Sequence, residues 1–189
     1  MDLTARQKIM LLLFKDFTTS YNSRNLSKII GLSHAGAFKI MKKLEAKNIV
    51  SPKKIGKAVI YSINLNNPLA DKEIELALII EAQNYKKWLE EFKELNKKSD
   101  FIILFGSILK NEKYAKDIDL LVVANKFNSK EIKGLIAQKN KILNKKLHPI
   151  LQTLNDFKKD ISNKNKVLLE IIKTGVVLFG QDKLVKELK

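Results

Sequence analysis

The chain has 189 residues, of which 36 are basic, 20 are acidic and none is cysteine. Hydrophobic residues make up 45% and charged residues 30% of the sequence, which excludes collagen-like and wholly disordered chains. Without cysteine there is no disulfide, thiolate metal site or cysteine nucleophile, and two histidines cannot form a histidine-rich zinc site. A metal ion would therefore need carboxylate ligands, and the length leads us to expect two small folded modules.

Apolar and charged residues are distributed unevenly along the chain. The apolar run Ile9 to Phe14 is shorter than a signal-peptide core or a membrane span, so we expect a cytoplasmic protein without a membrane partner. Residues 1–65 hold 12 basic and 3 acidic residues, residues 66–97 hold 5 and 7, and residues 98–189 hold 19 and 10. Two basic modules flanking an acidic connector suit a polyanionic partner such as nucleic acid; solubility alone is the alternative explanation.

Three helices are predicted in the first module. Apolar residues between Leu3 and Phe17 have helical spacing, and a short second helix is expected around Asn25–Ile30. Gly31-Leu32-Ser33 is typical of a tight turn that ends in a helix N-cap, so the third helix starts at Ser33. The buried face of this helix is predicted to carry Ala37, Ile40, Met41 and Leu44. Its exposed side is basic and carries His34, Lys39, Lys42 and Lys43.

Two short strands are predicted next, at Ile49-Val50 and Ala58–Ile63, with Pro52–Lys57 as the Lys-rich connection of a hairpin. The segment GLSHAGAFKIMKKLEAKNIV followed by GKAVIYSINLN resembles the winged helix-turn-helix domain of MarR- and ArsR-like regulators. The resemblance implies a recognition helix in the major groove of double-stranded DNA and a wing on adjacent phosphates. The candidate DNA-binding residues are His34, Lys39, Lys42, Lys43, Lys53, Lys54 and Lys57. A winged scaffold used for protein contacts is the alternative.

The connector, residues 66–97, is predicted to form one long helix. After Pro68 the chain contains neither glycine nor proline up to Asn96, and its apolar residues lie near heptad spacing. Trp88 and Phe92 would pack on a flanking domain or against a second subunit. Packing against a second subunit would form a homodimer and would place two winged domains on a two-fold DNA site.

The second module contains the clearest chemical pattern. An apolar strand, Phe101 to Phe105, ends in Gly106-Ser107, and Asp117-Ile118-Asp119 follows after nine residues at the start of another strand. Glycine lets the backbone approach a bulky anion, and a serine hydroxyl with neighbouring backbone N–H groups can bind phosphates. Asp117 and Asp119 are two apart on a strand, so both carboxylates project from one face. Paired carboxylates bind Mg²⁺, which would orient a nucleoside triphosphate.

A strand, Gly-Ser, nine residues and Asp-x-Asp on a strand resemble the signature of the DNA polymerase β-like nucleotidyltransferases, in particular the minimal nucleotidyltransferases. The resemblance includes the ending EIIKTGVVLFGQDKLVKELK. It implies that Gly106, Ser107 and Lys110 bind the nucleotide, ATP by expectation, and that Asp117 and Asp119 are catalytic residues and metal ligands. It also implies transfer of a nucleoside monophosphate to a hydroxyl, and a role as an antitoxin beside a HEPN-type toxin.

The sequence departs from this family where a third carboxylate is usual. That residue would lie on the next strand, here Lys146 to Thr153, but no acidic residue occurs between Glu131 and Asp156. His148 is the residue expected at that position, and neutral imidazole is a poor replacement for a carboxylate. We favour a partly buried strand histidine over a catalytic role for His148; Asp156 could reach the site from the following turn.

The sequence therefore predicts an α+β protein: a winged helix-turn-helix domain at 1–65, a connecting helix at 66–97 and a nucleotidyltransferase-like domain with a small mixed sheet at 98–189. The first functional hypothesis is a DNA-binding nucleotidyltransferase. The second is a transcriptional regulator whose nucleotidyltransferase-like domain is catalytically inactive and serves nucleotide sensing or dimerisation. The third is an RNA-processing transferase that uses the winged domain as a clamp.

Overall fold

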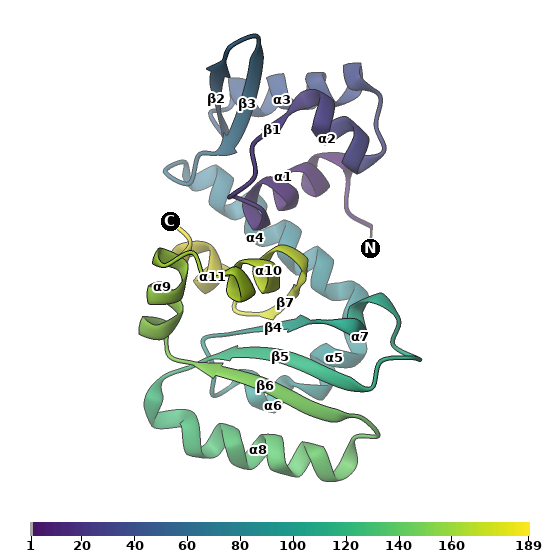
Figure 1. Ribbon diagram of the computed structural model, residues 1–189, viewed down its shortest axis with the longest axis vertical. Helices are drawn as coiled ribbons and strands as arrows, with labels where there is room; N and C mark the ends of the chain where they lie inside the picture. The colour runs from purple at the N-terminus through teal and green to yellow at the C-terminus, as the bar shows by residue number, and fades with distance from the viewer. Residues whose placement is uncertain (1) are drawn as a thin grey trace. The chain divides into compact units, whose positions relative to one another are not determined.

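The computed structural model describes residues 2–189, which form two compact units (Figure 1). The first extends to Ile80 and includes Lys189, and the second comprises Glu81–Leu188. No helix among residues 2–189 has both the length and the apolar character needed to cross a membrane.

Helices dominate the first unit, together with a three-stranded antiparallel sheet of order β1-β3-β2. Its elements are α1 (Ala5–Lys15), β1 (Tyr21–Asn22), α2 (Ser23–Ile30), α3 (His34–Ala46), β2 (Val50–Ile55), β3 (Ala58–Ile63) and the larger part of α4 (Pro68–Ala82).

The predicted start of α3 is confirmed. The Ser33 side chain accepts a hydrogen bond of 3.0 Å from the Gly36 backbone N–H, as an N-cap residue does. Gly31, which ends α2, has a φ of 77°, a left-handed conformation that glycine adopts without steric cost. Of the four apolar residues predicted for the buried face, Ala37, Met41 and Leu44 are fully buried. Ile40 is half-buried.

The hairpin of the first unit differs from the sequence prediction. Strand pairing continues as far as Ile55 opposite Ala58, so the turn consists of Gly56 and Lys57 alone. The expected connection at Pro52–Lys57 is therefore mostly strand. Proline is tolerated at position 52 because β2 lies at the edge of the sheet, where a missing N–H can face solvent.

The prediction of one long connecting helix is wrong. The segment is helical but broken into α4, a 3₁₀ turn η1 (Gln83–Tyr85), α5 (Lys86–Glu91) and α6 (Lys93–Asn96). The breaks allow Trp88 and Phe92, whose rings stack at 5.8 Å, to enter the core of the second unit, where both are buried. These rings are thus intrachain core residues and are not exposed to a second subunit.

The second unit contains a four-stranded mixed sheet of order β6-β5-β4-β7, in which β5 and β6 are parallel and the other pairs antiparallel. The predicted α+β class with a small mixed sheet is confirmed. Besides α5 and α6, its elements are β4 (Phe101–Phe105), α7 (Ser107–Lys110), β5 (Asp117–Val123), η2 (Lys126–Asn128), α8 (Ser129–Ile142), β6 (Lys146–Gln152), α9 (Leu154–Ser162), α10 (Lys166–Thr174), β7 (Val176–Phe179) and α11 (Gln181–Glu187).

Helices lie on both sides of this sheet, with α5, α6 and α8 on one side and α9, α10 and α11 on the other (Figure 1). Ile118 and Leu120 of β5 belong to the core cluster that also holds Trp88 of α5 and Ile132 of α8. The opposite face packs against α9 through an edge-to-face contact of 5.0 Å between Phe101 and Phe157. Because side chains alternate along a strand, Asp117 and Asp119 belong to this second face.

Candidate functional site

The turn between β4 and α7 brings the backbone of Gly106 against Asp119. Gly106 has a φ of 83° and a ψ of −155°, a conformation that is available essentially to glycine alone. A Cβ atom at this position would lie 2.1 Å from Oδ2 of Asp119. The glycine is therefore needed both for the backbone conformation and for the close approach to the carboxylate.

Strand β5 holds the two carboxylates in place. Ile118, between them, is 1% exposed and anchors the strand in the core on the other face. In the sheet, Asp119 lies opposite Phe105 of β4 on one side and His148 of β6 on the other. The carboxylates thus project from a strand that is hydrogen-bonded on both sides, which restricts their movement.

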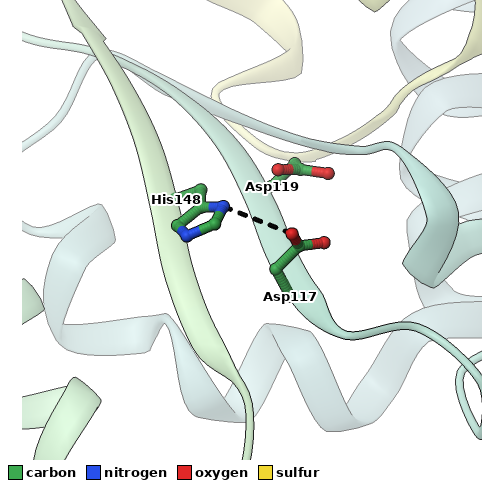
Figure 2. A group of neighbouring side chains, drawn as sticks. All are labelled: Asp117, Asp119 and His148. Atoms are coloured by element: carbon green, nitrogen blue, oxygen red, sulfur yellow. Dashed lines mark ion pairs between the residues drawn. The ribbon is translucent and has the colours of Figure 1, made fainter.

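His148 completes a cluster with the two aspartates (Figure 2). Its Nδ1 atom lies 3.3 Å from Oδ2 of Asp117, and one ligand atom from each of the three side chains lies within 4.8 Å of the others. The His148 side chain is 51% exposed. The interpretation of His148 as a partly buried structural histidine is therefore corrected: it faces the carboxylates at the place where the family's third carboxylate was expected.

Electrostatics in this cluster favour a bound cation. Burial and, second, the charge of Asp117 raise the pKa of Asp119 above its ordinary value, while His148 acts in the opposite direction. Two carboxylates and an imidazole nitrogen form a donor set that suits a divalent cation. Such an ion would neutralise triphosphate charge and orient the α-phosphate for displacement. The Asp119 carboxylate itself occupies the space that a Cβ of residue 106 would take, so it lies directly against the Gly106 backbone.

A cleft of about 590 Å³ adjoins the cluster, a volume typical of small-molecule sites. One wall is formed by Gly106, Ser107 and Lys110, the three residues that the sequence assigned to the nucleotide. The other wall is α10, with Lys166 and Glu170 among its residues. Sequence reasoning missed the α10 residues, because a lysine at the start of a helix does not by itself indicate a cleft; in the structure the neighbouring Val167 is 63% exposed.

Asp156 does not join the cluster. It is the third residue of α9, and its Oδ2 accepts hydrogen bonds from the Oγ1 and backbone N–H of Thr153, at 2.7 and 3.2 Å. These hydrogen bonds lower the pKa of Asp156. The suggestion that Asp156 reaches into the site is therefore wrong, because its carboxylate is engaged in a helix capping box.

The residues proposed for DNA contact are all exposed and lie on two elements of the first unit. His34, Lys39, Lys42 and Lys43 lie on α3, and Lys53, Lys54 and Lys57 lie on β2 and the following turn. Lys42 pairs with Glu45 at 2.9 Å, and its Nζ lies 5.9 Å from the centre of the Phe38 ring. Phe38, which sequence reasoning did not single out, is 46% exposed among these basic residues.

Comparison with known proteins identifies the second unit. The family model described as nucleotidyltransferase domain matches residues 85–180. None of the curated proteins matches the chain. Two solved structures of mutant forms of Lactococcus lactis ZitR are 17% and 16% identical over 73% of this chain and 76% and 77% of theirs, each with a TM-score of 0.34. This TM-score is too low to support an argument about the first unit. The match to residues 85–180 spans half of the sequence and includes the Gly106-Ser107 turn and both aspartates, and the chain belongs to the nucleotidyltransferase domain family.

Proposed function

We propose that the chain binds a nucleoside triphosphate with a divalent cation and transfers its nucleoside monophosphate to a hydroxyl acceptor. The observation that carries the proposal is the position of Asp119. Its carboxylate belongs to the metal-binding cluster and also lies against the backbone of Gly106, which lines the adjoining cleft. A cation between phosphate and carboxylates would therefore lie where the cleft meets β5.

In the proposed reaction the acceptor hydroxyl releases its proton to water as its oxygen attacks the α-phosphorus, the bond between that phosphorus and the oxygen bridging to the β-phosphate breaks, and pyrophosphate leaves. Ser107, Lys110 and Lys166 line the cleft, and in this proposal their hydroxyl and ammonium groups bind triphosphate oxygens. Asp117 and Asp119 would hold the cation. We expect ATP as the donor, Mg²⁺ as the ion that accompanies it and a hydroxyl of a HEPN-type partner protein as the acceptor.

Thermal unfolding with each nucleoside triphosphate, with and without Mg²⁺, tests this proposal. A triphosphate at about 100 times its dissociation constant should add roughly 2.7 kcal/mol to the free energy of unfolding. Asp117→Asn should abolish this gain, whereas Asp182→Asn, an exposed carboxylate in the first turn of α11, should retain it. Incubation with α-labelled nucleotide and the candidate acceptor then tests transfer. Binding without transfer would favour the nucleotide-sensing alternative, and no binding would contradict the proposal.

We propose double-stranded DNA as the partner of the first unit. The proposal is supported by the seven exposed basic residues that α3 and the β2–β3 hairpin carry. Lysine side chains on two adjacent elements can neutralise phosphates along one duplex. Bound DNA would make the chain a regulator as well as a transferase, as in an antitoxin that represses its own gene.

A further inference from the structure

We propose that His148 is the third ligand of the metal cluster and that its nitrogen makes the site prefer a borderline transition-metal ion, such as Co²⁺, to Mg²⁺. This inference rests on the proposed function for the location of the site. It concerns the identity of the ion that the nucleotide-free protein binds.

The geometry of the cluster suits a shared ion. Two donor atoms bonded to one ion at about 2.1 Å lie about 3.0 to 3.4 Å apart for angles between octahedral and tetrahedral. The separation of His148 Nδ1 and Asp117 Oδ2 is 3.3 Å. One oxygen of Asp119, one oxygen of Asp117 and one ring nitrogen of His148 lie within 4.8 Å of one another. All three side chains point to the same side of the sheet (Figure 2), so an ion would reach them from one direction.

Among the β6 side chains on this face, the only other candidate ligand is Gln152, which lies farther along the strand. The residues of β6 that share the face of Asp117 and Asp119 are Lys146, His148, Ile150 and Gln152. The Gln152 amide donates a hydrogen bond of 2.6 Å to Asp160 and lies opposite Val123, four residues beyond Asp119 along β5. His148 lies directly opposite Asp119, so it is the β6 side chain placed to ligate.

The chemistry of the third donor decides which ion is preferred. Mg²⁺ prefers an octahedron of oxygen atoms and loses water reluctantly, whereas imidazole suits borderline ions and binds more strongly from Mn²⁺ to Co²⁺. An Asp-Asp-His set therefore favours the transition metals. The Mg²⁺ that accompanies a triphosphate is held largely by phosphate oxygens and one or two carboxylates, so the preference is compatible with the proposed nucleotide binding.

Calorimetric titration of the nucleotide-free, full-length protein with Mg²⁺, Mn²⁺ and Co²⁺ tests the inference. We expect the wild type to bind Co²⁺ at least about tenfold more tightly than Mg²⁺, and His148→Ala to lose at least about tenfold of its Co²⁺ affinity. His148→Asp should shift the Co²⁺ to Mg²⁺ affinity ratio toward Mg²⁺ by a similar factor. His34→Ala removes the other histidine of the chain, which lies in the first unit, and should leave the three affinities unchanged.

Equal Co²⁺ affinity in the wild type and His148→Ala would overturn the inference, as would an unchanged ion preference in His148→Asp. The visible absorption of bound Co²⁺ gives a second readout, because it responds to the replacement of a nitrogen ligand by oxygen. His148→Gln provides a further variant if His148→Asp is unstable. The proposed function is tested separately: nucleotide binding with an unchanged ion preference would overturn the His148 assignment alone, and an ion preference that follows His148 without nucleotide binding would overturn the function alone.

Discussion

The backbone of Gly106 lies directly against the carboxylate of Asp119, from the adjacent strand: a Cβ atom at position 106 would be 2.1 Å from Asp119 Oδ2. The turn after β4 is thus in direct contact with the cluster that Asp117 and Asp119 of β5 form with His148 of β6. A change in either is expected to disturb the other.

Gly106→Ala is expected to weaken nucleotide binding and to destabilise the fold. The φ of 83° would be strained in alanine, at a cost of about 1–3 kcal/mol. The new methyl group would also displace the Asp119 carboxylate, because its nearest neighbours are atoms of that side chain and a side chain rotates more easily than the backbone moves. Denaturant unfolding measures the first effect, and triphosphate titration measures the second.

Gly134→Ala is the matched control. Gly134 lies within α8, and a Cβ there would meet no atom within 4 Å. Alanine in a helix interior should raise the free energy of unfolding by about 0.5–1 kcal/mol without affecting nucleotide binding. Equal nucleotide affinity in Gly106→Ala and the wild type would contradict the role assigned to the β4–α7 turn.

Asp119→Asn is expected to make the ligand-free protein more stable at neutral pH while abolishing triphosphate-dependent stabilisation. Burial and the charge of Asp117 raise the pKa of Asp119. The native state therefore holds this proton more tightly than the unfolded state, so stability falls as pH rises from the ordinary carboxyl pKa through the raised one. Asparagine does not ionise, so the variant does not lose stability in this pH range through residue 119.

Unfolding of the wild type and Asp119→Asn between pH 3 and pH 7 checks this sign, with about pH 4 as the ordinary carboxyl value. The stability difference should grow with pH in favour of the variant. DNA affinity should stay within about threefold of the wild type if the two sites are separate. A variant less stable than the wild type at pH 7, with Asp182→Asn unchanged, would count against the electrostatic account.

Replacement of Lys42, Lys43 and Lys57 by alanine should flatten the salt dependence of DNA binding. Each phosphate contact that is lost should reduce the slope of log K against log salt by about 0.9. Fluorescence anisotropy with a labelled duplex at several salt concentrations measures the slope. The control is a variant with the same loss of charge on the exposed side of α8: Lys130, Lys133 and Lys141 to alanine. A slope for the Lys42, Lys43 and Lys57 variant that equals the wild-type slope would exclude the α3–hairpin surface as the DNA-binding site.

Asp156→Asn is expected to lower the melting temperature and to leave metal and nucleotide binding unchanged. Its carboxylate caps α9 through Thr153, and these hydrogen bonds lower its pKa. The stabilisation is therefore present above the ordinary carboxyl pKa and is lost as pH falls through the lowered one. Thermal unfolding at pH 7 and pH 3 measures it, with the exposed neighbour Asn155→Ala as the control. Loss of metal binding in Asp156→Asn would place this residue in the site after all.

Local pattern alone determined several features of this protein. The apolar stripe of α3 and the Ser33 cap follow from helical period and capping chemistry. Strands β4 and β5 follow from two apolar runs, the first of which ends before Gly106 and the second of which begins with the Asp117–Asp119 pair. These signals lie within one element or at its ends. They were sufficient to predict helices and strands in both modules, whereas the mixed sheet of the second module was expected from the resemblance to the nucleotidyltransferases.

Tertiary structure decided which distant residues meet at the site. His148 reaches Asp117 because β6 returns parallel to β5 after the α8 crossover, in a register set by pairing across the sheet. Lys166 lines the cleft because α10 packs on β4. The breaks after α4 accompany the burial of Trp88 in the core of the second unit, and burial of a large aromatic side chain is favourable. Strand register and helix packing depend on contacts between residues far apart in the chain, which local periodicity does not encode.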